Sequence, residues 1–295
     1  MSSAGRWGLV HMRSAGTHFG FAFAPTDEPV LQQAANGLFA FTLLVSVFVA
    51  IPVANAQNVL DGSAPAVITT NDRPVAPRSA DNIISSVIEH NRIRNDRLRS
   101  YSALRRYEII NSDGQVSAEA MVRVDYRSPG GKEFQKISED GTWVVRHLVF
   151  DRVLQTEEVT SSGSALRESA ISEENYVFAT VREEDLGSNH CYVVRAEPKR
   201  ADKYLFEGEL WIDAQDFAIV KISGHPAGRM SLWINRAEFV REYQKIEGFW
   251  LPYRDETVVD MKVHGKKVFR IEHQQYVVNA KNTAGLSLAG FAQSH

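Results

Sequence analysis

The stretch Gln115–Arg127, with the sequence QVSAEAMVRVDYR, decides the fold. Polar residues alternate in it with apolar or small ones, and the latter are Val116, Ala118, Ala120, Val122, Val124 and Tyr126. Successive residues of a β-strand point to opposite faces of a sheet, so this pattern predicts one long strand with a buried face and a solvated face. Such a strand is typical of an antiparallel sheet.

Turn residues flank this strand on both sides. Asn111–Gly114 precedes it and Pro129–Gly131 follows it, and both segments contain residue types that favour tight turns. The neighbouring strands are expected at Tyr101–Ile110 and Lys132–Ser138, which gives a three-stranded antiparallel meander.

A second β region follows closer to the C-terminus. Its seven expected strands are Asn175–Arg182, Cys191–Glu197, Lys203–Asp213, Phe217–Ser223, Ser231–Tyr243, Trp250–Val263 and Lys267–Asn279. Short turns connect them, and a flat sheet of roughly ten strands tends to curl. Residues 81–279 are therefore expected to form one α+β, mainly β domain, in which a large curved antiparallel sheet makes an incomplete, half-open barrel.

About two helices are expected to cover this sheet. Ser79 or Asp81 can cap the first helix, which continues through Arg99 with apolar residues near a 3.6-residue spacing. The second is expected over Trp143–Leu154, where apolar residues recur without turn residues. The chain's one basic cluster spans the second half of the first helix and the residues after it: Arg92, Arg94, Arg97, Arg99, Arg105 and Arg106. A solvated face is the expected role of this cluster, with contact to lipid headgroups as the alternative.

Residues 1–56 indicate export. The apolar run LFAFTLLVSVFVAI is about 14 residues long, which is short for a membrane span, and small residues precede the Ala56–Gln57 bond. A secretory signal peptide cleaved between these two residues is expected, so the protein would be periplasmic or otherwise exported. A retained membrane anchor is the alternative. Residues 57–80, with three prolines, predict an extended linker, and residues 280–295 predict a disordered tail.

Composition argues against several classes of function. The chain has 33 basic and 36 acidic residues, so nucleic acid is not an expected partner. Its single cysteine, Cys191, lies in the apolar run CYVV and predicts a buried structural thiol. Signature motifs of serine hydrolases, P-loop proteins, dinucleotide-binding folds and zincins are absent from the sequence, so we expect no enzyme, cofactor or metal site. Carboxylates paired by the fold are the remaining catalytic alternative.

Three segments carry a family resemblance. Phe206–Asp213 (FEGELWID), Phe217–Ile222 (FAIVKI) and Gly248–Pro252 (GFWLP) resemble the periplasmic lipoprotein-carrier (LolA/LolB-like) superfamily. The resemblance extends over most of Ala80–Asn279 and implies an incomplete antiparallel barrel closed by helices, with an apolar concave surface that shelters acyl chains. No residue of this chain could be matched to the arginine that some such carriers use in gating.

The expected function is that of an exported, monomeric carrier, which binds acyl chains of a lipid or lipoprotein on its concave face and contacts membranes transiently. The candidate pocket residues are Val122, Val124, Tyr126, Phe206, Leu210, Ile212, Trp233 and Phe239. Each of them could instead pack against the helices as ordinary core. The alternative function is a periplasmic sensor or interaction module, in which the concave surface or a sheet edge takes an envelope protein partner.

Overall fold

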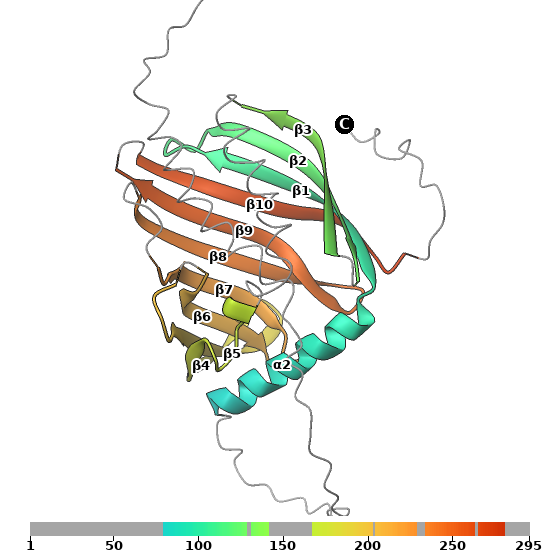
Figure 1. Ribbon diagram of the computed structural model, residues 1–295, viewed down its shortest axis with the longest axis vertical. Helices are drawn as coiled ribbons and strands as arrows, with labels where there is room; N and C mark the ends of the chain where they lie inside the picture. Colours follow the sequence, from blue (N-terminus) through green and yellow to red (C-terminus); the bar gives the residue numbers. More distant parts are fainter. Residues whose placement is uncertain are drawn as a thin grey trace, which may run out of the picture.

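The computed structural model describes residues 79–128, 131–141, 167–202, 204–228, 234–262 and 265–280. Within these ranges one long helix accompanies ten strands of a single antiparallel sheet (Figure 1). The mainly β class is thereby confirmed. The leader, the linker up to Arg78, the helix expected over Trp143–Leu154 and the tail after Ala280 lie outside the described residues.

The strands follow the sequence expectation closely. They are β1 (Ser100–Ile110), β2 (Val116–Arg127), β3 (Gly131–Asp140), β4 (Tyr176–Leu186), β5 (Asn189–Pro198), β6 (Phe206–Asp213), β7 (Ile219–Pro226), β8 (Ile234–Ile246), β9 (Phe249–Met261) and β10 (Gly265–Val278). One end differs clearly, because β4 continues to Leu186, whereas the expected strand ended at Arg182. Of the acidic residues in this extension, Glu183 and Asp185 are exposed, and Glu184 is half-buried and accepts a hydrogen bond from Trp211 Nε1.

The strand order is β3-β2-β1-β10-β9-β8-β7-β6-β5-β4. Two meanders, β1–β3 and β4–β10, are therefore joined edge to edge by the pairing of β1 with β10. Strands β3 and β4 lie at the two free edges, so the sheet curves without closing into a barrel (Figure 1).

Helix α2 (Ala80–Arg97) lies across one end of the curved sheet (Figure 1). It begins after Ser79, whose side chain accepts a hydrogen bond from the Asn82 backbone N–H at 3.4 Å. It buries three apolar side chains, Ile83, Ile84 and Val87, against the sheet. The expected cover of about two helices is corrected to this one helix for the part of the chain that the structure describes.

The two faces of the sheet have different chemistry. The inner face, defined here as the face that packs with α2, carries one large apolar cluster with members from β2 to β4. The outer face carries a smaller cluster around Trp211 and Trp250. It also carries ion pairs that link neighbouring strands, such as Arg106–Glu119 at 2.7 Å and Arg270–Glu256 at 3.1 Å. The curvature therefore encloses an apolar surface.

Gly208 on β6 and Gly224 on β7 are paired across the ladder where the two backbones come very close. A Cβ on Gly208 would meet the Ser223 carbonyl oxygen at 2.1 Å and the Gly224 Cα at 2.6 Å. We predict that Gly208→Ala lowers the free energy of unfolding by about 2–3 kcal/mol, because backbone atoms would have to move. Urea denaturation measures this loss.

The control is Gly114→Ala in the β1–β2 turn, where φ is +84° and no atom lies within 4 Å of the added Cβ. This change should cost only about 1 kcal/mol, from the backbone conformation alone. Equal losses in the two variants would contradict the close approach at Gly208.

Candidate functional site

The structure places the expected pocket residues of the described ranges on the inner face. Val122, Val124, Phe206, Leu210 and Ile212 are fully buried in the apolar cluster, and Phe239 is 5% exposed. Tyr126 is half-buried and stacks on Tyr101, with ring centroids 5.2 Å apart. Trp233 lies outside the described residues, as do Ala56 and Gln57.

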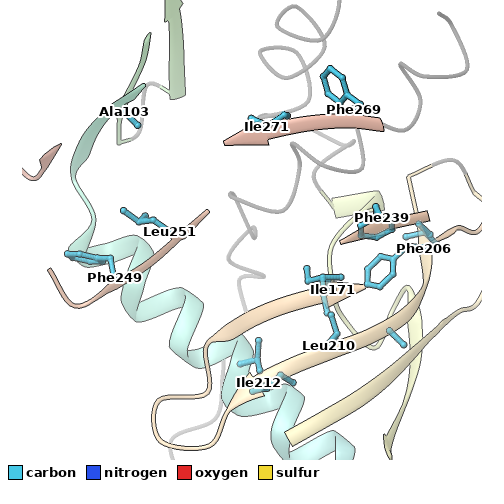
Figure 2. Packing of buried hydrophobic residues seen from close by; sticks show 14 of the residues in the cluster. Ala103, Ile171, Phe206, Leu210, Ile212, Phe239, Phe249, Leu251, Phe269 and Ile271 are labelled. Atoms are coloured by element: carbon cyan, nitrogen blue, oxygen red, sulfur yellow. The ribbon is translucent and has the colours of Figure 1, made fainter. Parts of the chain in front are cut away.

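These residues form two groups within the cluster. Phe206 and Phe239 meet edge to face with ring centroids 5.6 Å apart, and Figure 2 shows them in the same region as Leu210 and Ile171. Val122 and Val124 belong to the other half of the sheet, on β2. Ile171 precedes β4 and is 2% exposed, so the chain that leads into the edge strand contributes to the same core.

A polar cluster interrupts this apolar face, and the sequence analysis did not identify it. Arg241 on β8, Asp255 on β9 and His273 on β10 are 3%, 4% and 4% exposed. The Arg241 guanidinium donates through Nε to Asp255 Oδ1, and His273 Nε2 lies 2.9 Å from Asp255 Oδ2. One carboxylate is thus shared by two cationic or ionisable partners from the neighbouring strands.

Two further arginines belong to the same region. Arg105 is paired with His273 across the β1–β10 ladder, is 3% exposed, and donates to the Tyr107 hydroxyl at 3.3 Å. Arg94 reaches it from α2, since its charge acts on the hydroxyls of Tyr243 and Tyr276. We call Arg94, Arg105, Arg241, Asp255 and His273 the inner polar cluster.

The electrostatics of this cluster are those of buried charge. Burial alone would raise the pKa of Asp255, but the charge of Arg241 and the hydrogen bonds from His273 and Arg241 hold it below its usual value. Burial lowers the pKa of Arg94, so the fold disfavours the charged form of that side chain. Burial also raises the pKa of Tyr276 well above 10 and keeps its hydroxyl neutral.

The expected solvated role of the basic residues is wrong for Arg105. Arg92 is exposed and bridges Glu89 and Asp96 on the surface of α2, as a solvated face requires. Arg94 is half-buried, and Arg105 is buried within the protein. The period-two pattern contained a signal for Arg105, because it occupies the same strand face as the buried Ala103 and Tyr107.

Cys191 lies on the outer face and confirms the expected buried thiol. Its side chain is fully buried beside Val193 and Trp211 in the outer cluster, and burial raises its pKa to about 11. Its Sγ donates to the Asn189 carbonyl oxygen at 3.5 Å. A thiol held neutral in this way suits packing and not nucleophilic chemistry.

A groove lies beside the free edge strand β4. It has a volume of about 570 Å³ and is lined by the start of α2 and by residues 178–183. Val177 and Val181 on the same strand are 55% and 44% exposed. An unpaired strand edge with exposed apolar side chains can accept an added strand from a partner.

In the part of the chain that the structure describes, no group of three or more His, Cys, Asp or Glu side chains could hold a metal ion. None of the helices in the described ranges is sufficiently long and apolar to span a membrane.

Comparisons with known proteins give partial matches. A family model described only as "Uncharacterized protein" matches residues 162–283, and no curated protein matches the chain. A solved DUF1329 family protein from Desulfovibrio piger is 12% identical, with a TM-score of 0.37 over 70% of this chain and 95% of that one. A LolA superfamily protein from Nitrosomonas europaea is 12% identical, with a TM-score of 0.32 over 69% of this chain and 95% of that one.

The chain resembles LolA superfamily structures. It is also similar to MucB of Pseudomonas aeruginosa in its complex with MucA, at 11% identity and a TM-score of 0.24 over 68% of this chain and 99% of that one. The LolA superfamily that the sequence motifs indicated is thus among the solved neighbours. At these identities and TM-scores the neighbours assign no residue role or ligand to this chain.

The shared carboxylate gives a prediction for stability. Asp255→Asn should lower the free energy of unfolding at pH 7 by about 3–5 kcal/mol, because Arg241 is left buried without its counter-charge. Glu256→Gln, one residue along on the outer face, removes a partly exposed partner of Arg254 and Arg270 and should cost below about 1 kcal/mol. Urea denaturation distinguishes the two, and equal losses would contradict the buried ion pair.

The same carboxylate predicts a pH dependence. The pKa of Asp255 is lower in the folded state than the value of 3.8 for an unperturbed carboxyl, so its contribution is complete above that value and is lost as the pH falls through the folded-state pKa. The stability difference between wild type and Asp255→Asn should therefore shrink as the pH is lowered from 5 toward 2. A constant difference across this range in urea titrations would show that the fold does not lower the pKa of Asp255.

Proposed function

We propose that the inner face of the sheet binds an apolar chain and that the protein is an exported carrier of a lipid or lipoprotein. The observation that supports this proposal is the extent of the apolar inner face. Its cluster extends from β2 across to β4, and among the described residues Ile83, Ile84 and Val87 of α2 pack with it. A curved sheet that stays open at both edges can admit a long chain to such a face.

The energetics of this binding are favourable for an acyl chain. Each buried methylene contributes about 0.8 kcal/mol, so a chain of twelve carbons gains about 9 kcal/mol before the costs of ordering and association. The inner face also carries small residues, among them Ala103, Ala118 and Ala120. Their short side chains occupy little of the space in which such a chain would lie. In this proposal the protein acts as a monomer, without cofactor or chemistry on the ligand, and the signal in residues 1–56 directs its export.

A second candidate function is an interaction module, and the β4 edge favours it. The groove beside α2 and the exposed Val177 and Val181 offer backbone groups and apolar side chains to an extended segment of an envelope protein. In this case the apolar inner face is ordinary core.

The carrier proposal predicts copurifying ligand. Protein isolated from envelope without detergent should carry a stoichiometric acyl-bearing molecule in native mass spectrometry and lipid extraction. Ala120→Phe places a ring on the inner face of β2, where Ala120 is 1% exposed, and should reduce bound ligand at least about tenfold. Ala179→Phe, on the exposed side of β4, is the matched control and should retain the ligand.

Circular dichroism and thermal melting establish that both variants are folded. A wild-type protein of apo mass that shows no mass shift with dodecanoate would contradict the carrier proposal. A purified envelope partner that binds this apo protein, and whose binding is lost on Val181→Lys, would then support the interaction module.

A further inference from the structure

We propose that the groove beside β4 binds, as an added strand, a segment of a partner protein in which apolar and basic residues alternate. This inference goes beyond the carrier proposal, because it does not depend on a ligand at the inner face. It rests on the second candidate function, the interaction module, and states the chemistry of its partner.

The backbone of β4 has one open side. β4 is the last strand of the sheet among the described strands and lies beside the start of α2 (Figure 1). Its other side is paired with β5 from Tyr176 to Leu186. A free strand edge offers N–H and C=O groups that an extended peptide can satisfy. Residues 178–183 line the groove, and a strand of about six residues spans about 20 Å, so a short segment would fill it.

Apolar side chains are exposed along this edge. Val177 is 55% exposed and lies on the outer face, because the next residue, Phe178, belongs to the inner apolar cluster. A register shift between Thr180 and Arg182 leaves Val181 out of the pairing with β5, and its side chain is 44% exposed. Apolar residues of an added strand would remove both valines from water.

The inner side of the groove is acidic. Asp81 at the start of α2 and Glu183 of β4 both line it. Glu183 lies on the inner face of its strand, because the next residue, Glu184, accepts a hydrogen bond from Trp211 Nε1 in the outer cluster. The two carboxylates therefore belong to the side of β4 on which α2 packs.

The cations near these carboxylates are already paired. Arg182 lines the groove, but it forms an ion pair with Glu184 on the outer face at 2.6 Å. His190 lies 3.1 Å from Glu183 Oε2 and 2.8 Å from Asp185 Oδ1. One imidazole carries at most one positive charge, so it cannot balance both carboxylates. A lysine or arginine of the occupant would complement this charge.

The two sides of the groove thus favour different side chains on the occupant. Apolar residues would contact the valines on the outer side, and basic residues would face Asp81 and Glu183 on the inner side. Successive residues of a strand point to opposite faces, so apolar and basic residues must alternate along the segment. A second copy of this chain would bring another acidic edge to this one, and like charges oppose such a pairing.

The test uses labelled synthetic peptides and the full chain, with affinity measured by fluorescence anisotropy. The basic probe is Ser-Val-Lys-Val-Lys-Val-Lys-Ser, and the acidic probe has glutamate at each lysine. A third probe is the basic peptide with N-methyl groups on two successive central residues, which keeps its charge but removes backbone donors. We expect the basic probe to bind at least about tenfold more tightly than either of the others.

Variants locate the basic residues of the occupant. Asp81→Asn and Glu183→Gln should each weaken binding of the basic probe at least about threefold, because each removes one carboxylate from the groove. Glu247→Gln in the β8–β9 turn is the matched control, since this acid is exposed and lies away from the groove, and should leave the affinity unchanged. Circular dichroism and thermal melting verify that each variant is folded.

Cross-linking identifies the occupant of the edge. A photoreactive benzoylphenylalanine in place of Val177, which is exposed, should cross-link to the basic probe. A cross-link to a second copy of this chain, or to residues 57–78 of the same chain, would overturn the proposal and assign the edge to that occupant.

The remaining outcomes separate this proposal from the carrier. Equal affinities of the basic and acidic probes would overturn the basic partner. Equal affinities of the basic probe and its N-methylated form would overturn strand addition. A protein that binds dodecanoate but none of the peptides would overturn the edge site and leave the carrier intact.

Discussion

The constraint on which this structure depends is that an open sheet of ten strands has to remove one whole face from water. Ion pairs between strands allow the outer face to stay partly solvated, whereas the inner face carries a nearly continuous apolar surface. One apolar cluster includes residues from both halves of the sheet, among them Ile271 of β10 and Leu210 of β6, which are labelled in Figure 2. Among the described residues, α2 contributes three buried apolar side chains to this surface.

The inner polar cluster is the clearest departure from this design. A row of charged side chains in the middle of an apolar face lowers stability relative to a hydrophobic alternative, and Asp255 offsets part of this cost by pairing with Arg241 and His273. Positions at which polar residues interrupt the apolar face of a strand are often functional sites. The break in the sheet occurs on four neighbouring strands, β8, β9, β10 and β1, where Arg241 is paired with Asp255 and Arg105 with His273.

Much of the fold could be predicted from the sequence, because period-two alternation and turn residues are local signals. Both located the ten strands, although β4 continues to Leu186, beyond the predicted end at Arg182. The apolar site candidates could be predicted for the same reason. The polar cluster could not be predicted, because its members lie far apart in the sequence, as Arg105 and His273 do. Only the strand order brings those on the sheet together. Basic residues are also usually exposed, which favoured the wrong interpretation of Arg105.

The position of β1 between β2 and β10 determines when the sheet can be completed. The first strand to leave a ribosome or a membrane pore has its second partner at the far end of the chain, where Tyr101 is paired with Val278. Until β10 has emerged, the first meander has an unsatisfied edge and no attachment to the second. Contacts of such large sequence separation slow folding, so the nascent chain would remain open for most of its synthesis or translocation. An unfolded chain of this kind can be threaded through a narrow pore and is exposed to aggregation on the far side until its last strand arrives.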